Sequence, residues 1–255
     1  MKLSKTSVLY VAVFIVALMI SGCFSADSNT SEGENGVLSY SLYTDYEASG
    51  NLSTGILPTL VTHRIEVYST GAESIGRYDE IIHKVEPSDN AIIITDDDDY
   101  SIPDFTIKVS KPGKYTVITK NSRKEIDRIT LNFEDPASLK VVTKIREPYK
   151  YTFDKAAESS NITTEEGSQV AFIPYFYNAD NVRMIGNIGC EYTADPDWMV
   201  VPDVEWNSET EDSSWTANYA SSYYFIEEGT VTFTIWHEES GMTGRQKFTI
   251  TPAGE

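Results

Sequence analysis

Four consecutive aspartates, Asp96, Asp97, Asp98 and Asp99, form the densest group of potential metal ligands in this sequence. Carboxylate oxygens are the ligands that calcium prefers in proteins. The group follows a β-branched run at residues 91–95, so we expect it in a loop after a strand. It lacks the spacing of an EF-hand, and adjacent like charges are typical of a solvated loop. The sequence therefore favours a solvated loop and leaves a calcium site as the alternative.

The three histidines, His63, His83 and His237, do not have the short spacing of zinc motifs. Two glutamates follow His237, as at the start of a metalloprotease helix, but the second histidine of that motif is missing. His63 alternates with apolar residues, which predicts a position in the core. We expect no metal-binding or catalytic role for any of them.

Cys190 is the one cysteine in the body of the chain, and the sequence signature of the base that a catalytic thiol needs is absent. A buried structural thiol is the favoured interpretation. The sequence contains no G-x-S-x-G nucleophile motif and no glycine-rich phosphate or dinucleotide motif. Glycosidases use paired carboxylates, and with 39 acidic residues such a pair stays open as the least favoured function, a carboxylate-based hydrolase. We expect neither catalytic residues nor a cofactor.

Aromatic and small polar residues are concentrated between residues 206 and 225. The aromatic residues there are Trp206, Trp215, Tyr219, Tyr223, Tyr224 and Phe225. This mixture is typical of recognition loops, and aromatic rings also stack on sugars. Alternation within a strand would instead point Tyr223 and Phe225 into a core, and we favour that interpretation for those two. Trp206, Trp215 and Tyr219 remain the candidate ligand-binding residues, with carbohydrate as the candidate ligand.

The amino-terminal segment consists of Lys2 and Lys5 followed by 13 apolar residues, Val8 to Ile20. A helix that crosses a bilayer needs about 20 apolar residues. A short apolar run after a basic region is typical of a secretory signal peptide. We therefore assign residues 1–22 to a signal peptide.

The signal peptide ends in Ile20-Ser21-Gly22-Cys23, which resembles the lipobox of bacterial lipoproteins. The resemblance implies that the Cys23 thiol takes a diacylglyceryl group and becomes the first residue after cleavage. An uncleaved anchor helix with an incidental cysteine is the alternative. Two or three acyl chains hold a protein stably on a membrane, at about 0.8 kcal/mol per buried CH₂. Phe24 stands where the sorting pattern would place an aspartate, which implies the outer membrane or cell surface.

Residues 23–36 form the predicted tether between this anchor and the body. Residues 25–36 read SADSNTSEGENG, in which one alanine is the only apolar residue. Such a segment cannot bury enough apolar surface to offset the entropy lost on ordering. We expect a flexible spacer.

The rest of the chain has the two-residue period of strands. Apolar residues alternate near residues 61–67, 105–109, 115–117, 129–133, 139–145, 149–153, 231–235 and 248–250. Many short strands separated by turn residues predict an antiparallel β-sandwich. Pro174, inside the apolar run Val170 to Tyr177, suggests an edge strand or a bulge. Asp154 to Ser160 is the one candidate for a helical turn.

The two halves, residues 37–137 and 138–255, share an order of features. In each, a glycine leads into a strand, a short turn follows, and a final strand closes the half; the glycines are Gly113 and Gly229. This layout resembles bacterial immunoglobulin-like domains. The resemblance implies an all-β fold of two tandem immunoglobulin-like sandwiches, with Tyr192 or Trp198 as a buried central aromatic residue.

Composition limits the partners of this 255-residue chain. It has 20 basic and 39 acidic residues and a formal charge of -19, which argues against nucleic-acid binding. Removal of residues 1–22 leaves 18 basic and 39 acidic residues, a charge of -21, so acyl chains rather than surface charge would hold the protein to anionic lipid. We therefore expect a lipid-anchored, non-enzymatic cell-envelope protein with a structural, binding or adhesion role. Its partner would be an unidentified envelope protein or glycan, with carbohydrate binding as the alternative function.

Overall fold

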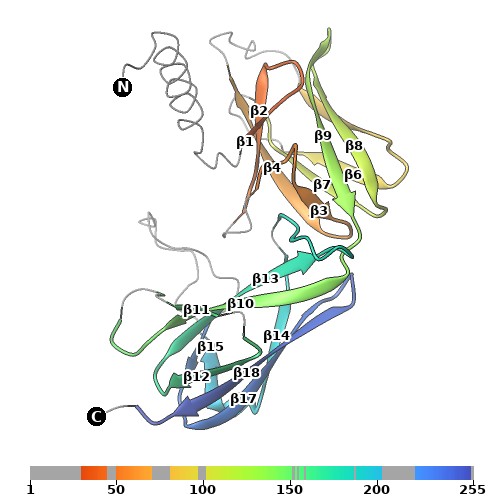
Figure 1. Ribbon diagram of the computed structural model, residues 1–255. Coiled ribbons are helices and arrows are strands. Elements are labelled where there is room, and N and C mark those ends of the chain that lie inside the picture. Colours follow the sequence, from red (N-terminus) through yellow and green to blue (C-terminus); the bar gives the residue numbers. More distant parts are fainter. Residues whose placement is uncertain are drawn as a thin grey trace, which may run out of the picture.

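The computed structural model describes residues 30–44, 50–70, 81–96, 102–150, 153, 155–157, 159–186, 188–202 and 222–253. Within these residues the chain forms 18 strands and one short 3-10 helix, η1 (Asp197–Met199), arranged in four sheets (Figure 1). No helix in this described part is long and apolar enough to cross a bilayer.

The first half of the chain forms two facing sheets. The five-stranded sheet has the order β1-β2-β4-β7-β6, with bounds Thr30–Glu32, Leu38–Leu42, Thr62–Ser69, Phe105–Val109 and Ala91–Thr95. The four-stranded sheet has the order β3-β9-β8-β5, with bounds Ile56–Pro58, Glu125–Glu134, Gly113–Lys120 and Ile82–Glu86. Their inner faces enclose the first core, in which Phe105, Leu131 and Phe133 are fully buried.

The second half repeats this arrangement. Its five-stranded sheet has the order β11-β10-β13-β16-β15, with bounds Lys155–Ala157, Ser138–Arg146, Gln169–Tyr177, Ser222–Phe225 and Val200–Pro202. Its four-stranded sheet has the order β12-β18-β17-β14, with bounds Asn161–Glu165, Met242–Thr251, Gly229–His237 and Glu191–Asp195. Phe172 lies at the centre of the second core, with ring centroids 4.7 Å from Phe233 and 6.1 Å from Phe248.

The two halves have the same topology except for the outermost strand of the larger sheet, because β1 precedes β2 in the chain whereas β11 follows β10. The other strands of the larger sheets have equivalent orders, β2-β4-β7-β6 and β10-β13-β16-β15, and so do the smaller sheets, β3-β9-β8-β5 and β12-β18-β17-β14. Each smaller sheet contains the last hairpin of its half, β8–β9 or β17–β18. Each half also contains one parallel pair, β3 with β9 and β12 with β18, beside its antiparallel pairs. Apart from the short η1, the described residues are therefore all-β and form two tandem immunoglobulin-like sandwiches.

The hairpins confirm the expected glycine entries. Gly113 begins β8 with φ 147°, and Gly229 begins β17 with φ 138°. Residues with a Cβ rarely adopt these values, so glycine allows the chain to turn into the strand. The two-residue period then places Val231, Phe233 and Ile235 in the core, each fully buried.

The predicted flexible tether is wrong from Thr30 onward. Residues Thr30–Glu32 form β1, which pairs antiparallel with β2, and Ser31 is only 2% exposed. The Ser31 hydroxyl donates to Asn51 Oδ1 at 2.9 Å. Backbone pairing and polar contacts order this segment, although it has no apolar residue to bury.

Two smaller predictions are also wrong, and a third holds for only one of its two candidate residues. Lys155–Ala157, inside the candidate helical turn Asp154 to Ser160, forms β11 and pairs with β10. Tyr149, expected in a strand, has φ 66° and is 98% exposed in a turn. Trp198 is 58% exposed in η1, and Tyr192 instead stacks on Phe172 with centroids 5.6 Å apart.

Pro174 lies in the middle of β13 at a local edge. β13 pairs with β10 over its full length, but with β16 only at residues 169–171. At Pro174 one side of the strand therefore has no described neighbour, so the missing N–H leaves no ladder bond unmade there. This agrees with the edge position that the proline predicted.

Two neutral histidines are buried in the first half of the chain. The His83 Nε2–H donates to the Pro103 carbonyl at 2.8 Å, and the Thr119 hydroxyl donates to His83 Nδ1 at 3.0 Å. The His63 Nε2–H donates to the Pro58 carbonyl at 3.1 Å, while its Nδ1 is buried without a hydrogen-bond partner. This confirms the core position predicted for His63.

We predict that these histidines weaken the fold in mild acid. Burial lowers the pKa of His63 and of His83 from 6.5 to about 4. The unfolded chain therefore binds protons that the folded chain does not. The histidines' contribution to stability is fully present above pH ~6.5 and is lost as the pH falls toward ~4, by about 2 kcal/mol each at pH ~5. Urea unfolding at about pH 7.5 and pH 5 would measure this loss.

The control for that measurement is the double variant His63→Gln, His83→Gln. Glutamine keeps a hydrogen-bonding side chain but does not titrate in this range. We expect the variant to lose roughly 4 kcal/mol less than the natural chain between the two pH values. An equal loss in both proteins would contradict the prediction.

Candidate functional site

Most of the residues that the sequence singled out lie outside the described residues: Cys23, Trp206, Trp215, Tyr219, Asp97, Asp98 and Asp99. Asp96 is described, and it ends the hairpin of β6 and β7, with its N–H bonded to the Asp104 carbonyl at 2.9 Å. Its carboxylate lies 3.6 Å from Arg64 Nε. Tyr223 and Phe225 do point into the second core, where Tyr223 lies 5.0 Å from Phe233 between ring centroids.

The histidines and Cys190 are not brought together. His63 and His83 lie in separate parts of the first half, and His237 ends β17 with Nδ1 3.0 Å from Ser240 Oγ. Cys190 is half-buried against the second core, and burial raises the pKa of its thiol to about 12. The thiol is therefore protonated at neutral pH and is a packing group. No group of three or more His, Cys, Asp and Glu side chains in the described residues could hold a metal ion.

The joint between the two sandwiches combines apolar and polar contacts between distant parts of the chain. Ile185, from the loop after β13, is 8% exposed and belongs to the first core. Its N–H donates to the Ile56 carbonyl at 2.8 Å. A Cβ on Gly50 or on Gly55 would collide with the Ile185 side chain, so these glycines make room for it.

The first sandwich in turn contributes side chains to the second core. Val61 is 4% exposed and packs in the second core, where Ile56 also lies against it. The His63 imidazole lies so close to the backbone of Gly186 that a Cβ on Gly186 would be 2.8 Å from the ring. Each core thus contains side chains from the other half of the chain.

Polar contacts surround this apolar exchange. The Asn178 side-chain amide donates to Glu134 Oε2 at 2.6 Å, joining the loop after β13 to the end of β9. Lys108 on β7 forms an ion pair with Glu239 in the turn between β17 and β18. The joint is therefore fastened at more than one point.

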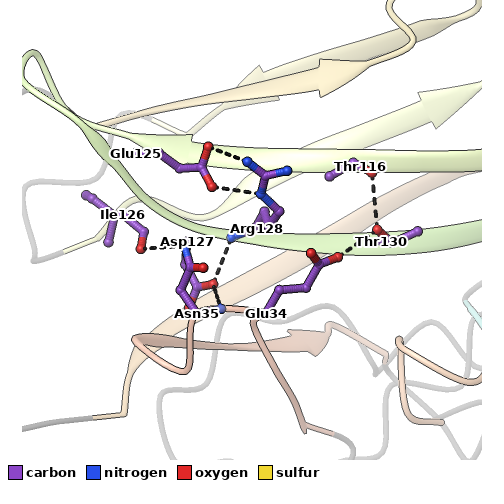
Figure 2. Close-up of polar contacts among 8 residues, drawn as sticks. All are labelled: Glu34, Asn35, Thr116, Glu125, Ile126, Asp127, Arg128 and Thr130. Atoms are coloured by element: carbon purple, nitrogen blue, oxygen red, sulfur yellow. Dashed lines mark hydrogen bonds and ion pairs between the residues drawn. The ribbon is translucent and has the colours of Figure 1, made fainter.

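A second ordered polar site lies where the chain enters the first sandwich (Figure 2). The Asp127 side chain on β9 is fully buried and accepts backbone N–H bonds from Asn35, Val37 and Leu38 at 2.7–2.9 Å. It also accepts the N–H of Arg128 at 2.8 Å. Backbone donors, rather than a cation, therefore satisfy this carboxylate.

This carboxylate fixes the turn between β1 and β2. Gly33 in that turn is so close to Asp127 that a Cβ would collide with the carboxylate. The Glu34 N–H donates to the Arg128 carbonyl at 2.8 Å, and its carboxylate accepts the Thr130 hydroxyl at 2.9 Å (Figure 2). Sequence reasoning missed this site. Its one signal was an aspartate inside an apolar strand pattern.

Two surface features lie on this framework. A hollow of about 210 Å³ lies between β10 and β18 and is lined by Leu139, Val141, Tyr177 and Arg245 among others. It is smaller than the roughly 300–1,000 Å³ of a typical small-molecule site. The outer face of β6 exposes Ile92 by 63% and Ile94 by 59%. Neither of these two features is a deep cleft.

No family model and no curated protein matches this sequence. The chain is similar to solved structures of surface-layer and adhesin proteins. They include the S-layer protein SbsC, domains 5–6 (14% identity, 84% of this chain, 100% of that chain, TM-score 0.28). The Escherichia coli adhesin FdeC is 9% identical, with 88% of this chain and 66% of that chain covered and a TM-score of 0.30. The Yersinia pseudotuberculosis adhesin InvE is 13% identical, with 86% of this chain and 61% of that chain covered and a TM-score of 0.27. The chain spans less than two thirds of the length of these two adhesin chains, and TM-scores of this size carry no argument about function.

We predict that Asp127→Asn weakens the first sandwich. The amide keeps one acceptor oxygen but turns an NH₂ group toward buried backbone donors, so donors lose their partner. Loss of bonds to a buried charged acceptor should lower the free energy of unfolding by about 3 kcal/mol or more. Chemical denaturation measures this. Glu125→Gln, which removes the charge of the exposed neighbouring ion pair with Arg128, is the control and should change stability far less. A similar effect of both variants would contradict the role of Asp127.

We predict that Ile185→Ala loosens the joint. Truncation of a buried isoleucine leaves a cavity and costs about 2–4 kcal/mol, here at the contact between the sandwiches. Small-angle scattering should show a broader distribution of shapes, and protease should cut the link between β9 and β10 faster. Ile226→Ala, at a position that is 48% exposed, is the matched control. Unchanged scattering and unchanged cleavage in Ile185→Ala would show that the joint does not depend on this side chain.

Proposed function

We propose that this chain is a lipid-anchored cell-envelope protein that presents a non-enzymatic binding or adhesion surface on two rigidly joined sandwiches. The observation that carries the proposal is the exchange of Ile185 and Val61 between the two cores. A joint of this kind holds the second sandwich in one orientation relative to the first. Such a joint suits a protein that must present a surface at a defined distance from its attachment point.

The attachment point follows from the sequence. Cys23 at the end of the predicted signal peptide would carry the acyl chains, and β1 begins only at Thr30. Even when fully extended, the intervening residues reach at most about 25 Å, at roughly 3.5 Å per residue. The first sandwich would therefore stay close to the membrane surface, while the net negative charge repels it from anionic head groups.

The Asp127 site suits this arrangement. The anchored segment would enter the fold through β1 and the turn at residues 33–37. One buried carboxylate accepts four backbone hydrogen bonds, two of them from that turn and one from Leu38 at the start of β2. These bonds fasten the entrance to β9, and the pairing of β1 with β2 supports them. A pull on the tether would then act on the sheet as a whole rather than unravel a terminal strand.

The alternative, carbohydrate binding through Trp206, Trp215 and Tyr219, gains no support from the described residues. Of the neighbouring aromatic residues that are described, Tyr223 and Phe225 pack in the second core, and the Tyr224 hydroxyl accepts a hydrogen bond from Arg146 at 2.7 Å. A partner protein is therefore the favoured ligand.

We predict that Cys23→Ala abolishes the membrane anchor. Without the thiol there is no site for the diacylglyceryl group, so the variant should leave the membrane fraction or remain unprocessed. Metabolic labelling with a fatty-acid analogue, intact mass and membrane fractionation would measure this. Cys190→Ala is the matched control, because it removes the other cysteine and should leave labelling unchanged. An unchanged mass and membrane fraction in Cys23→Ala would refute lipid anchoring.

A further inference from the structure

β6 is an unprotected edge among the edge strands of the described sheets. Natural proteins shorten exposed edge strands or place charges on them, because unpaired backbone groups can recruit another strand. β1, β3, β11 and β15 have three residues each. The longer edges carry exposed charges, namely Lys84 and Glu86 on β5, Glu165 on β12, and Glu191 and Asp195 on β14. β6 has five residues, Ala-Ile-Ile-Ile-Thr, and none is charged.

The free backbone groups of β6 can be assigned from its pairing with β7. The Asp96 N–H donates to the Asp104 carbonyl, and the Asn90 carbonyl accepts the N–H of Ser110. Backbone groups alternate in direction along a strand, so those of Ile92 and Ile94 also point to β7. The N–H and carbonyl groups of Ile93 and Thr95 therefore point away from the sheet, where no described strand pairs with them.

The side chains of β6 make this edge apolar as well as unpaired. Ile92 and Ile94 are 63% and 59% exposed on the outer face, while Ile93 packs against the first core. Full burial of an isoleucine side chain contributes roughly 1.5–3 kcal/mol. A strand that pairs with β6 and covers these two side chains would thus gain apolar contact together with main-chain hydrogen bonds.

Charge at the two ends of β6 selects the kind of strand that fits. Asp89 precedes β6 and Asp96 follows it, and the whole chain carries a net charge of -19. An antiparallel pair of two copies would bring the Asp96 end of one β6 next to the Asp89 end of the other, which like-charge repulsion opposes. A strand with basic ends would instead meet Asp89 at one end and, at the other, Asp96, whose carboxylate also contacts Arg64 at 3.6 Å.

We propose that β6 is a docking edge that adds a strand from a partner protein to the five-stranded sheet of the first sandwich. The partner segment is extended, apolar in its middle and basic at both ends. Main-chain bonds to Ile93 and Thr95 supply affinity, and Ile92 and Ile94 with the flanking aspartates supply specificity. This inference rests on the proposed binding function and gives it a location, but it does not depend on the lipid anchor.

The test uses the full-length processed protein in detergent micelles and a labelled peptide, Lys-Lys-Val-Thr-Val-Thr-Val-Lys-Lys. We expect the peptide to bind and to slow hydrogen exchange at the Ile93 and Thr95 amides. Thr95→Pro removes one outward N–H without removing a bond to β7, so the fold should survive, and peptide affinity should fall at least tenfold. Thr95→Val, which keeps the N–H, is the matched control and should bind as the natural chain does.

Side-chain and charge contributions have their own controls. Ile94→Lys should weaken binding at least tenfold, whereas Tyr68→Lys adds the same charge on the same face of the sheet, on β4, and should have little effect. A peptide with glutamates in place of the lysines should bind at least tenfold more weakly. Thermal unfolding would verify that every variant is folded.

Several results would overturn the proposal. They are no binding of the basic-ended peptide, equal affinity in Thr95→Pro and Thr95→Val, or binding without protection of the Ile93 and Thr95 amides. Self-association that Thr95→Pro abolishes would assign this edge to a second copy instead. Each of these results leaves fatty-acid labelling of Cys23 unaffected, so failure of the docking edge is distinguishable from failure of the lipid anchor.

Discussion

The exchange of apolar side chains at the joint is the constraint on which the arrangement of the molecule depends. Ile185 completes the first core, and Val61 lies in the second. Because each core includes a residue from the other half, a rotation of one sandwich would open a cavity in both. Burial of a side chain of this size contributes roughly 1.5–3 kcal/mol, so such a rotation costs far more than the loss of an exposed ion pair. The joint therefore fixes how the two sandwiches are arranged along the chain (Figure 1).

Buried polar groups fix details that apolar packing leaves open. The Asp127 carboxylate fixes the path of the turn between β1 and β2, and a separate buried chain of hydrogen bonds runs from the Tyr40 hydroxyl through the Thr119 hydroxyl to His83. Each such group is costly if its partner moves away, because a buried unpaired donor or acceptor loses its hydration. These sites therefore specify one conformation at positions where several apolar packings would have similar energies.

Local pattern predicted the strands well, because the two-residue period reports which face of a strand is buried. It predicted β7 from Phe105, Ile107 and Val109, and it predicted the repeated hairpins from their glycines. It could not reveal the parallel pairing of β3 with β9, since strand order is a long-range property. It also failed for β1 and Asp127, where backbone hydrogen bonds rather than apolar burial order the chain. The prediction that Trp198 could be a buried central residue failed, because an aromatic side chain near a strand end can face either the core or the solvent.

The candidate sites divide in the same way. The sequence singled out acidic, aromatic and cysteine residues by type, but the joint and the β6 edge depend on partners far apart in the chain. Ile185 looks like any apolar loop residue, and nothing local predicts that it packs against Gly50 and Gly55. Ile92 and Ile94 look like core residues, because a run of isoleucines has no polar face. Only the order of the sheet shows that β6 is an edge and that these two side chains face solvent. A strongly acidic chain can leave such an edge unprotected, since repulsion between copies discourages the self-pairing that charged edge residues prevent in other proteins. The same charge then makes the edge selective for a basic partner, so that repulsion supplies specificity at a surface where apolar contact alone would not discriminate.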